Sequence, residues 1–104
     1  MKEYKIKASV WLYPGMAGWH FVNIPKKESV EINEKYGKNR RGFGSLPATV
    51  TTGKTSWKTS IFPDKRSGTY LLPLKAEVRK KEKFGNGDTV RFTIKIHTID
   101  KYKT

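Results

Sequence analysis

Few side chains in this chain could catalyse a reaction. Its 104 residues include no cysteine, so the sequence excludes disulfides and thiolate chemistry. The two histidines, His20 and His97, stand far apart and have few carboxylates beside them. Ser45 and Ser60 lack the Gly-x-Ser-x-Gly frame that exposes a nucleophilic serine. These residues predict a protein that is not an enzyme and that uses no metal and no cofactor.

Basic side chains give the strongest functional signal. Lys and Arg number 22 against nine Asp and Glu, which makes the formal net charge +13. The first 34 residues contribute little, because four Glu nearly balance five Lys. Residues 35–104 hold the other 17 basic and five acidic residues, a net charge of +12. Such an excess attracts anions, so we expect nucleic acid or another anionic partner. Solubility alone is the other interpretation of this charge.

Seven polar or basic residues are candidates for contacts to such a partner. The basic clusters alternate with apolar and turn residues, which predicts a folded surface rather than a disordered arm. Exposed aromatic rings beside them would form a stacking platform for single-stranded nucleic acid. Trp11, Phe43 and Trp57 could supply these rings or could belong to the core. The candidate contact residues are Arg40, Arg41, Ser45, Lys58, Ser60, Arg79 and Lys80.

Two segments alternate apolar and polar residues with the period of a half-buried strand. They are residues 4–12, where every even position is apolar, and residues 90–96. Residues 19–24, 46–52, 55–62 and 69–74 are rich in β-branched and aromatic side chains and predict four more strands. The sequence Thr52-Gly53-Lys54 predicts the turn of a hairpin between the middle two.

Two charged segments predict short helices. Residues 26–36 place Ile32 and Tyr36 on one helical face, and residues 75–83 are good helix formers that stop before Gly85. Without a long crossover helix, the strands favour antiparallel pairing. We therefore expect a mainly β fold, a single antiparallel-rich β-barrel of six strands, or seven, with one or two short helices. One domain would span residues 1–104.

No apolar run is long enough to span a membrane or to form the core of a signal peptide. Together with the absence of cysteine, this favours a cytoplasmic protein without a membrane partner. Six strands can close a barrel within one chain, so we expect a monomer. A dimer is the alternative, because barrels built from swapped hairpins need two chains.

Residues 70–96 run through a strand, Pro73, a basic helix and a Gly87-Asp88 turn into another strand. This order is similar to the repeating half of the swapped-hairpin DNA-binding domains of antitoxins and transition-state regulators. Val78-Arg79 in the helix carries part of the similarity. The similarity concerns topology more than function, because such a crossover also serves barrels that bind nothing.

Six short motifs follow one another along most of the chain. They are WHFV (19–22) with Pro25, RGFGSLP (41–47), WKTSIFP (57–63), YLLPLK (70–75), VRK (78–80) and GDTV (87–90). In this order they resemble the family catalogued as domain of unknown function 1905, over about residues 4–96. The resemblance implies a small β-barrel with antitoxin-like relatives and no established activity. Its polar motif residues, Arg41, Ser45, Ser60 and Arg79, would either line a cleft or cap turns and strand ends.

Two functions follow from these observations. The first is a non-catalytic β-barrel that binds an anionic partner, with nucleic acid the leading choice. The second is a protein-interaction or small-ligand module, which would use a cleft between the loop at Gly42–Ser45 and the strand at Trp57–Pro63. Polar motif residues among aromatic ones are the feature that supports the second function.

Overall fold

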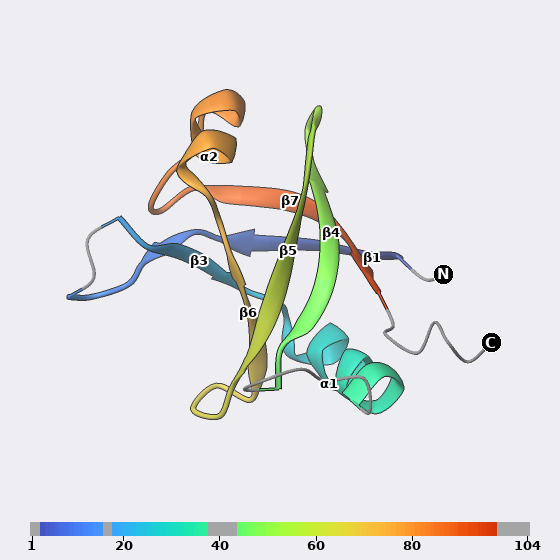
Figure 1. Cartoon of the computed structure of the whole chain (residues 1–104). Coiled ribbons are helices and arrows are strands. Elements are labelled where there is room, and N and C mark those ends of the chain that lie inside the picture. The colour runs from blue at the N-terminus through green and yellow to red at the C-terminus, as the bar shows by residue number, and fades with distance from the viewer. Residues whose placement is uncertain (1–2, 16–17, 38–43, 98–104) are drawn as a thin grey trace.

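Seven strands and two helices make up the described residues, 3–15, 18–37 and 44–97, of a computed structural model (Figure 1). The helices lie at opposite ends of the sheet (Figure 1). In chain order the elements are β1 (Glu3–Ser9), β2 (Trp11–Leu12), β3 (His20–Asn23), α1 (Lys26–Tyr36), β4 (Leu46–Thr52), β5 (Thr55–Asp64), β6 (Thr69–Pro73), α2 (Ala76–Glu82) and β7 (Thr89–Ile96).

The strands form one sheet that curls round on itself. Their order is β1-β7-β4-β5-β6-β3-β2, and every pairing is antiparallel. Its two end strands, β1 and β2, are consecutive in the chain and only Val10 separates them. The Val10 N–H donates to the Asp88 carbonyl, and the Val10 carbonyl accepts from the Gly87 N–H, both at 2.8 Å. The predicted mainly β, barrel-like antiparallel fold is confirmed, and the break at Val10 makes seven strands of the six predicted.

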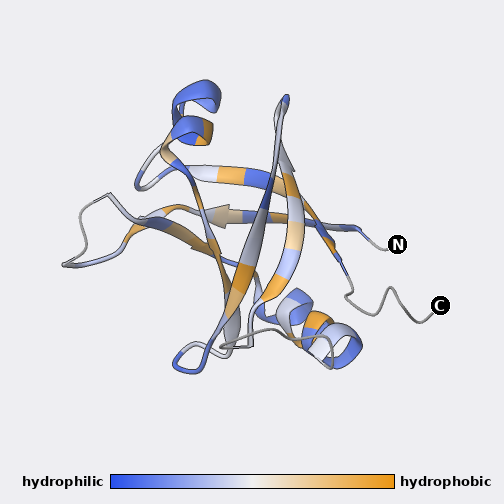
Figure 2. Cartoon of the chain, in the orientation of Figure 1, coloured by the Kyte–Doolittle hydropathy of each residue, from blue (hydrophilic) through white to orange (hydrophobic). Residues whose placement is uncertain are grey.

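Alternation along the strands builds the core. On β1, Tyr4 and Ile6 are buried, while Lys5 and Lys7 are exposed. Ile6 lies opposite Phe92 of β7, and Phe92, Ile94 and Ile96 of that strand are also buried. Figure 2 shows the resulting alternation of hydrophobic and hydrophilic residues along β4 and β7. Burial of each large apolar side chain contributes about 1.5–3 kcal/mol, so this inner layer is the main source of stability.

Helix α1 has the bounds predicted for residues 26–36. Ile32 and Tyr36 are buried in the core, as their spacing predicts. Ser29, also buried, joins the helix to the sheet: its hydroxyl donates to the Ile24 carbonyl at 2.9 Å and accepts from the Tyr70 N–H at 3.0 Å. The helix therefore closes one end of the sheet through both apolar and polar contacts.

Helix α2 is one residue shorter at each end than the predicted 75–83. Val78 is its buried residue, and the helix ends at Lys83, whose φ of 56° is left-handed. Glu82 connects it to the β4–β5 hairpin, accepting from the Thr55 hydroxyl at 2.6 Å and the Lys54 N–H at 3.2 Å. Gly53 in that turn has a φ of 57°, and a Cβ there would collide with the Glu82 carboxylate. The left-handed φ therefore favours glycine at this turn.

Strand β5 continues two residues beyond the predicted end at Phe62. Pro63 lies within it, opposite Tyr70 of β6. A polar turn follows, in which the Gly68 N–H donates to the Asp64 carbonyl at 2.9 Å. Neither helix in the described part of the chain is long and apolar enough to cross a membrane.

Candidate functional site

An open groove runs across the outer face of β5, β6 and β3, and we call it the β5–β3 groove. Because Trp57 and Ile61 of β5 face the core, Lys58, Ser60 and Phe62 face outward. On β6, Leu71 and Pro73 face outward in the same way. The groove has a volume of about 820 Å³ and is lined by Trp19, Phe21, Lys58, Thr59, Ser60, Phe62, Leu71, Pro73 and Lys75.

Aromatic rings dominate this groove. Trp19, which immediately precedes β3, is 53% exposed, and Phe62 of β5 is 37% exposed. The Trp19 ring rests on Phe21, with 5.9 Å between the ring centroids. Strand register places Phe21 opposite Pro73 and Phe62 opposite Leu71, so the apolar surface is continuous across three strands. Large apolar side chains that remain exposed together are typical of binding surfaces.

Cationic side chains stand beside the rings. Lys58 and Lys75 belong to the groove lining. Arg79 lines an adjoining hollow of about 410 Å³ that shares Trp19, Pro73 and Lys75 with the groove. Its guanidinium donates to the Leu74 carbonyl at 3.2 Å and to the Gly18 carbonyl at 3.3 Å. Arg79 therefore holds the residue before Trp19 and still presents further N–H donors.

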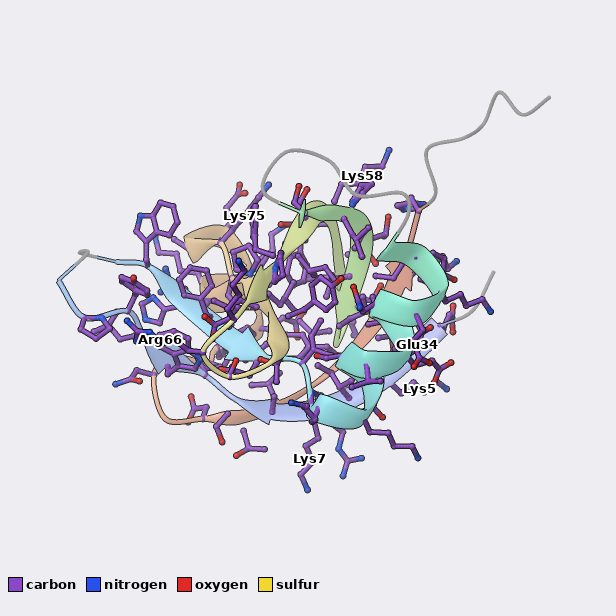
Figure 3. All side chains as sticks on the ribbon, turned by 90° about the horizontal axis from the view of Figure 1, so that it is seen from below. Lys5, Lys7, Glu34, Lys58, Arg66 and Lys75 are labelled. Atoms are coloured by element: carbon purple, nitrogen blue, oxygen red, sulfur yellow. The ribbon has the colours of Figure 1, made fainter. Side chains whose placement is uncertain are left out.

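A second aromatic cluster extends the surface over β2. Trp11 packs against Phe21 and Tyr13, with centroid distances of 5.4 and 5.9 Å. The Trp11 indole N–H donates to the Asn23 side chain at 2.7 Å, which fixes the ring. A hollow of about 530 Å³ beside it is lined by Arg66 and shares Leu71 with the groove. In Figure 3, Lys58, Lys75 and Arg66 lie along the upper and left margin of the molecule, away from Lys7 and Glu34.

The predicted contact residues are only partly brought together. Lys58 and Ser60 line the groove, and Arg79 lines the hollow beside it. Lys80 is exposed on α2 but lines none of these hollows. Ser45 is buried, at 8% exposure, immediately before β4. Arg40 and Arg41 lie outside the described residues, as do residues 42 and 43 of the Gly42–Ser45 loop that was expected to form one wall of a cleft.

The exposed rings differ from those the sequence suggested. Trp57 is 9% exposed and belongs to the core, Trp11 is half-buried, and Phe43 lies outside the described residues. Trp19 and Phe62 were not predicted as binding residues. The sequence does contain a signal for Phe62. Trp57 and Ile61 belong to the apolar face of the strand, and alternation along a strand points the residue after Ile61, which is Phe62, outward. The strand predicted to begin at residue 19 begins at His20, so Trp19 lies outside it and alternation gives no signal for its exposure.

The groove's described lining holds neither a carboxylate nor an imidazole. His20 contacts the Gly18 carbonyl through Nδ1 at 2.9 Å, and His97 contacts the Thr49 hydroxyl through Nε2 at 2.7 Å. Across residues 3–15, 18–37 and 44–97, no three His, Asp or Glu side chains gather in a way that could hold a metal ion. Planar rings and cations give the groove the means to stack a flat group and to pair with an anion.

Comparison with known proteins agrees with the resemblance inferred from the motifs. The profile of a family described as a domain of unknown function (DUF1905) matches residues 7–94. The match therefore runs from β1 into β7 and includes every element between them. No curated protein matches the chain.

Proposed function

The chain belongs to the DUF1905 family, whose description assigns no activity, and from the β5–β3 groove we propose that this member is a non-catalytic module that binds single-stranded nucleic acid. The observation that carries the proposal is the exposure of Trp19 and Phe62 on an apolar groove whose lining also holds Lys58 and Lys75. Bases would stack on the rings, and phosphates would pair with the ammonium groups.

The energy of stacking on the rings, rather than the charge, distinguishes the groove from the rest of the basic surface. Base stacking on an aromatic side chain contributes about 1–3 kcal/mol per base and tolerates any base. A cation near a phosphate adds affinity that falls with salt and carries no sequence information. With a net charge of +13, this protein attracts nucleic acid over much of its surface. The groove is where attraction and stacking coincide.

Arg79 has a positioning part in this proposal. Its guanidinium donates to the Gly18 carbonyl, and Gly18 has a φ of 78°, a conformation that favours glycine. These two features set the direction in which the chain enters Trp19 and β3. Loss of Arg79 would therefore affect the ring as well as the local charge.

A small planar anion is the second candidate ligand. The groove's volume, about 820 Å³, lies in the range of small-molecule pockets, and most of its lining is apolar. Such a ligand would use the same rings and a single cation. This candidate corresponds to the small-ligand module that the sequence suggested as an alternative. Strand β5 forms one wall of the site as expected, but β6 and β3, rather than the Gly42–Ser45 loop, form the other.

Fluorescence anisotropy with labelled 15-nucleotide single strands tests the proposal. Trp19→Ala should weaken binding about tenfold, the loss expected when one base no longer stacks. Val30→Ala on α1 is the matched control, because Val30 is an exposed apolar residue (43%) outside the groove. Binding that both variants leave unchanged, or that both weaken equally, contradicts a stacking groove. A mononucleotide that binds as tightly as the oligonucleotide, and loses affinity in Trp19→Ala, favours the second candidate.

A further inference from the structure

A second basic surface lies on the outer face of β1, β7 and β4. Lys7 of β1 stands directly opposite Arg91 of β7, and both side chains are exposed. Residues opposed in this way have Cβ atoms about 4.5–5.5 Å apart, and like charges there destabilise a sheet. On the same two strands Glu3 faces Lys95, with 3.7 Å between Oε2 and Nζ. The opposed charges therefore attract at the Glu3–Lys95 end of this strand pair and repel at the Lys7–Arg91 end.

A hollow of about 480 Å³ opens over the mismatched pair, and we call it the β1–β7 hollow. The backbone ladder between β4 and β7 ends at Thr51 and Thr93. Beyond it the Thr52 hydroxyl donates to the Arg91 carbonyl at 2.8 Å and keeps the two strands together. The hollow is lined by Lys5, Ile6, Lys7, Thr51, Thr52, Gly53, Arg91, Phe92 and Thr93.

The lining is cationic and rich in hydroxyl groups. It contains three basic side chains and, among the described residues, no acidic one. Strand register forms a row in which Thr93 stands between Lys5 and Thr51, next to the row of Lys7 and Arg91. Glu82 reaches the nearby β4–β5 turn, where its Oε2 accepts from the Thr55 hydroxyl, but it is not part of the lining.

We propose that the β1–β7 hollow binds an oligophosphate, an anion with two or more linked phosphate groups. Lys7 and Arg91 would hold one phosphate between them, with the planar guanidinium donating two parallel hydrogen bonds. Lys5, two residues along β1 and about 7 Å away, would pair with the next phosphate. The Thr93 hydroxyl would donate to an oxygen between them. The bound anion removes the repulsion between Lys7 and Arg91.

This site is separate from the β5–β3 groove and does not depend on the function proposed there. The two linings share no residue. Figure 3 shows Lys5 and Lys7 on the opposite side of the molecule from Lys58 and Lys75. The phosphates could belong to a free oligophosphate or to the backbone of a nucleic acid, since both present the same chemistry to the hollow.

Titration of isotope-labelled protein with inorganic tripolyphosphate at constant ionic strength tests the proposal. Saturable amide shifts should gather in residues 5–7, 51–53 and 91–93. Lys7→Glu should weaken binding at least tenfold, because the phosphate then meets a carboxylate. Lys65→Glu is the control: it makes the same change of charge at an exposed turn residue outside the hollow, and should alter affinity less than twofold.

A second measurement separates a binding role from a structural one. Without ligand, Lys7→Glu should raise the melting temperature, because it converts a like-charged pair with Arg91 into an opposite one. Stability and affinity would then change in opposite directions. A variant that loses stability, or that keeps the affinity of the wild type, overturns the proposal. Equal loss of affinity in Lys65→Glu overturns it as well.

An abasic deoxyribose-phosphate 10-mer distinguishes the two sources of phosphate. Tighter binding of this polymer than of tripolyphosphate, lost in Lys7→Glu, identifies the hollow as a backbone site. Tighter binding of tripolyphosphate identifies a free oligophosphate as the ligand. If neither probe binds saturably, the proposal is overturned. Because neither probe carries a base, these results stand apart from the effect of Trp19→Ala on oligonucleotide binding.

Discussion

The buried phenol of Tyr4 makes the stability of the fold depend on pH. The Tyr4 side chain is 3% exposed inside the sheet. Burial, with a further contribution from the Glu31 carboxylate, raises the pKa of Tyr4 to about 12 from its usual value of 10.0. The folded protein therefore keeps a proton that the unfolded chain releases between pH 10 and 12. The stability that this provides is complete below pH 10 and is lost as the pH rises through 12.

We predict that Tyr4→Phe flattens the loss of stability between pH 10 and 12, because the shifted group is gone. Urea unfolding midpoints, measured from pH 9 to pH 12, check this. Tyr13→Phe is the matched control, since Tyr13 is 40% exposed on the outer aromatic surface. That variant should decline as steeply as the wild type. Identical curves for the two variants would show that burial of Tyr4 does not cause the alkaline sensitivity.

At the scale of elements, one hydroxyl contributes strongly to the attachment of α1. Ser29 is 2% exposed and serves both the Ile24 carbonyl and the Tyr70 N–H. We predict that Ser29→Ala lowers the free energy of unfolding by about 2–3 kcal/mol, because two buried backbone groups lose their partner. Urea unfolding measures this. Ser56→Ala, at an exposed strand position, should cost less than about 0.5 kcal/mol. Equal costs would refute the role of Ser29.

The elements themselves were largely predictable from the sequence. Period-two alternation identified β1 and β7, and the Ile32–Tyr36 spacing identified α1, because a local pattern determines which face is buried. The break at Val10 was not predictable, since it depends on hydrogen bonds to residues 87 and 88 at the other end of the chain. The role of Ser29 was missed for the same reason.

At the scale of the whole molecule, the candidate site comes from distant parts of the sequence. Lys58 and Ser60 were predicted and line the groove, but Trp19 and Lys75 reach it only through the order β5-β6-β3. The position of a basic residue along the chain does not determine on which face of the sheet its charge lies. The division of the charge between two faces requires the sheet to curl, which places β1 and β5 on different sides.

Salt dependence should separate charge from stacking across the molecule. We predict that Lys58→Ala reduces the slope of log K against log salt for a single strand by about 0.7, the value for one lost phosphate contact. Trp19→Ala should lower the affinity and leave the slope unchanged, because a stacked ring releases no counterion. Anisotropy titrations at several salt concentrations measure both. An unchanged slope in Lys58→Ala would remove that lysine from the interface.

The pairing of β1 with β7 has a consequence for how the protein is made. These strands come from the two ends of the described chain, and seven residue pairs join them. While the chain emerges from a ribosome, β1 must wait without its partner until residue 96 has been added. Closure is then the last event, and contacts so distant in sequence slow folding toward the millisecond-to-second range. Until β7 pairs with β1, the side chains of Tyr4 and Ile6 stay exposed, and chaperones can bind them.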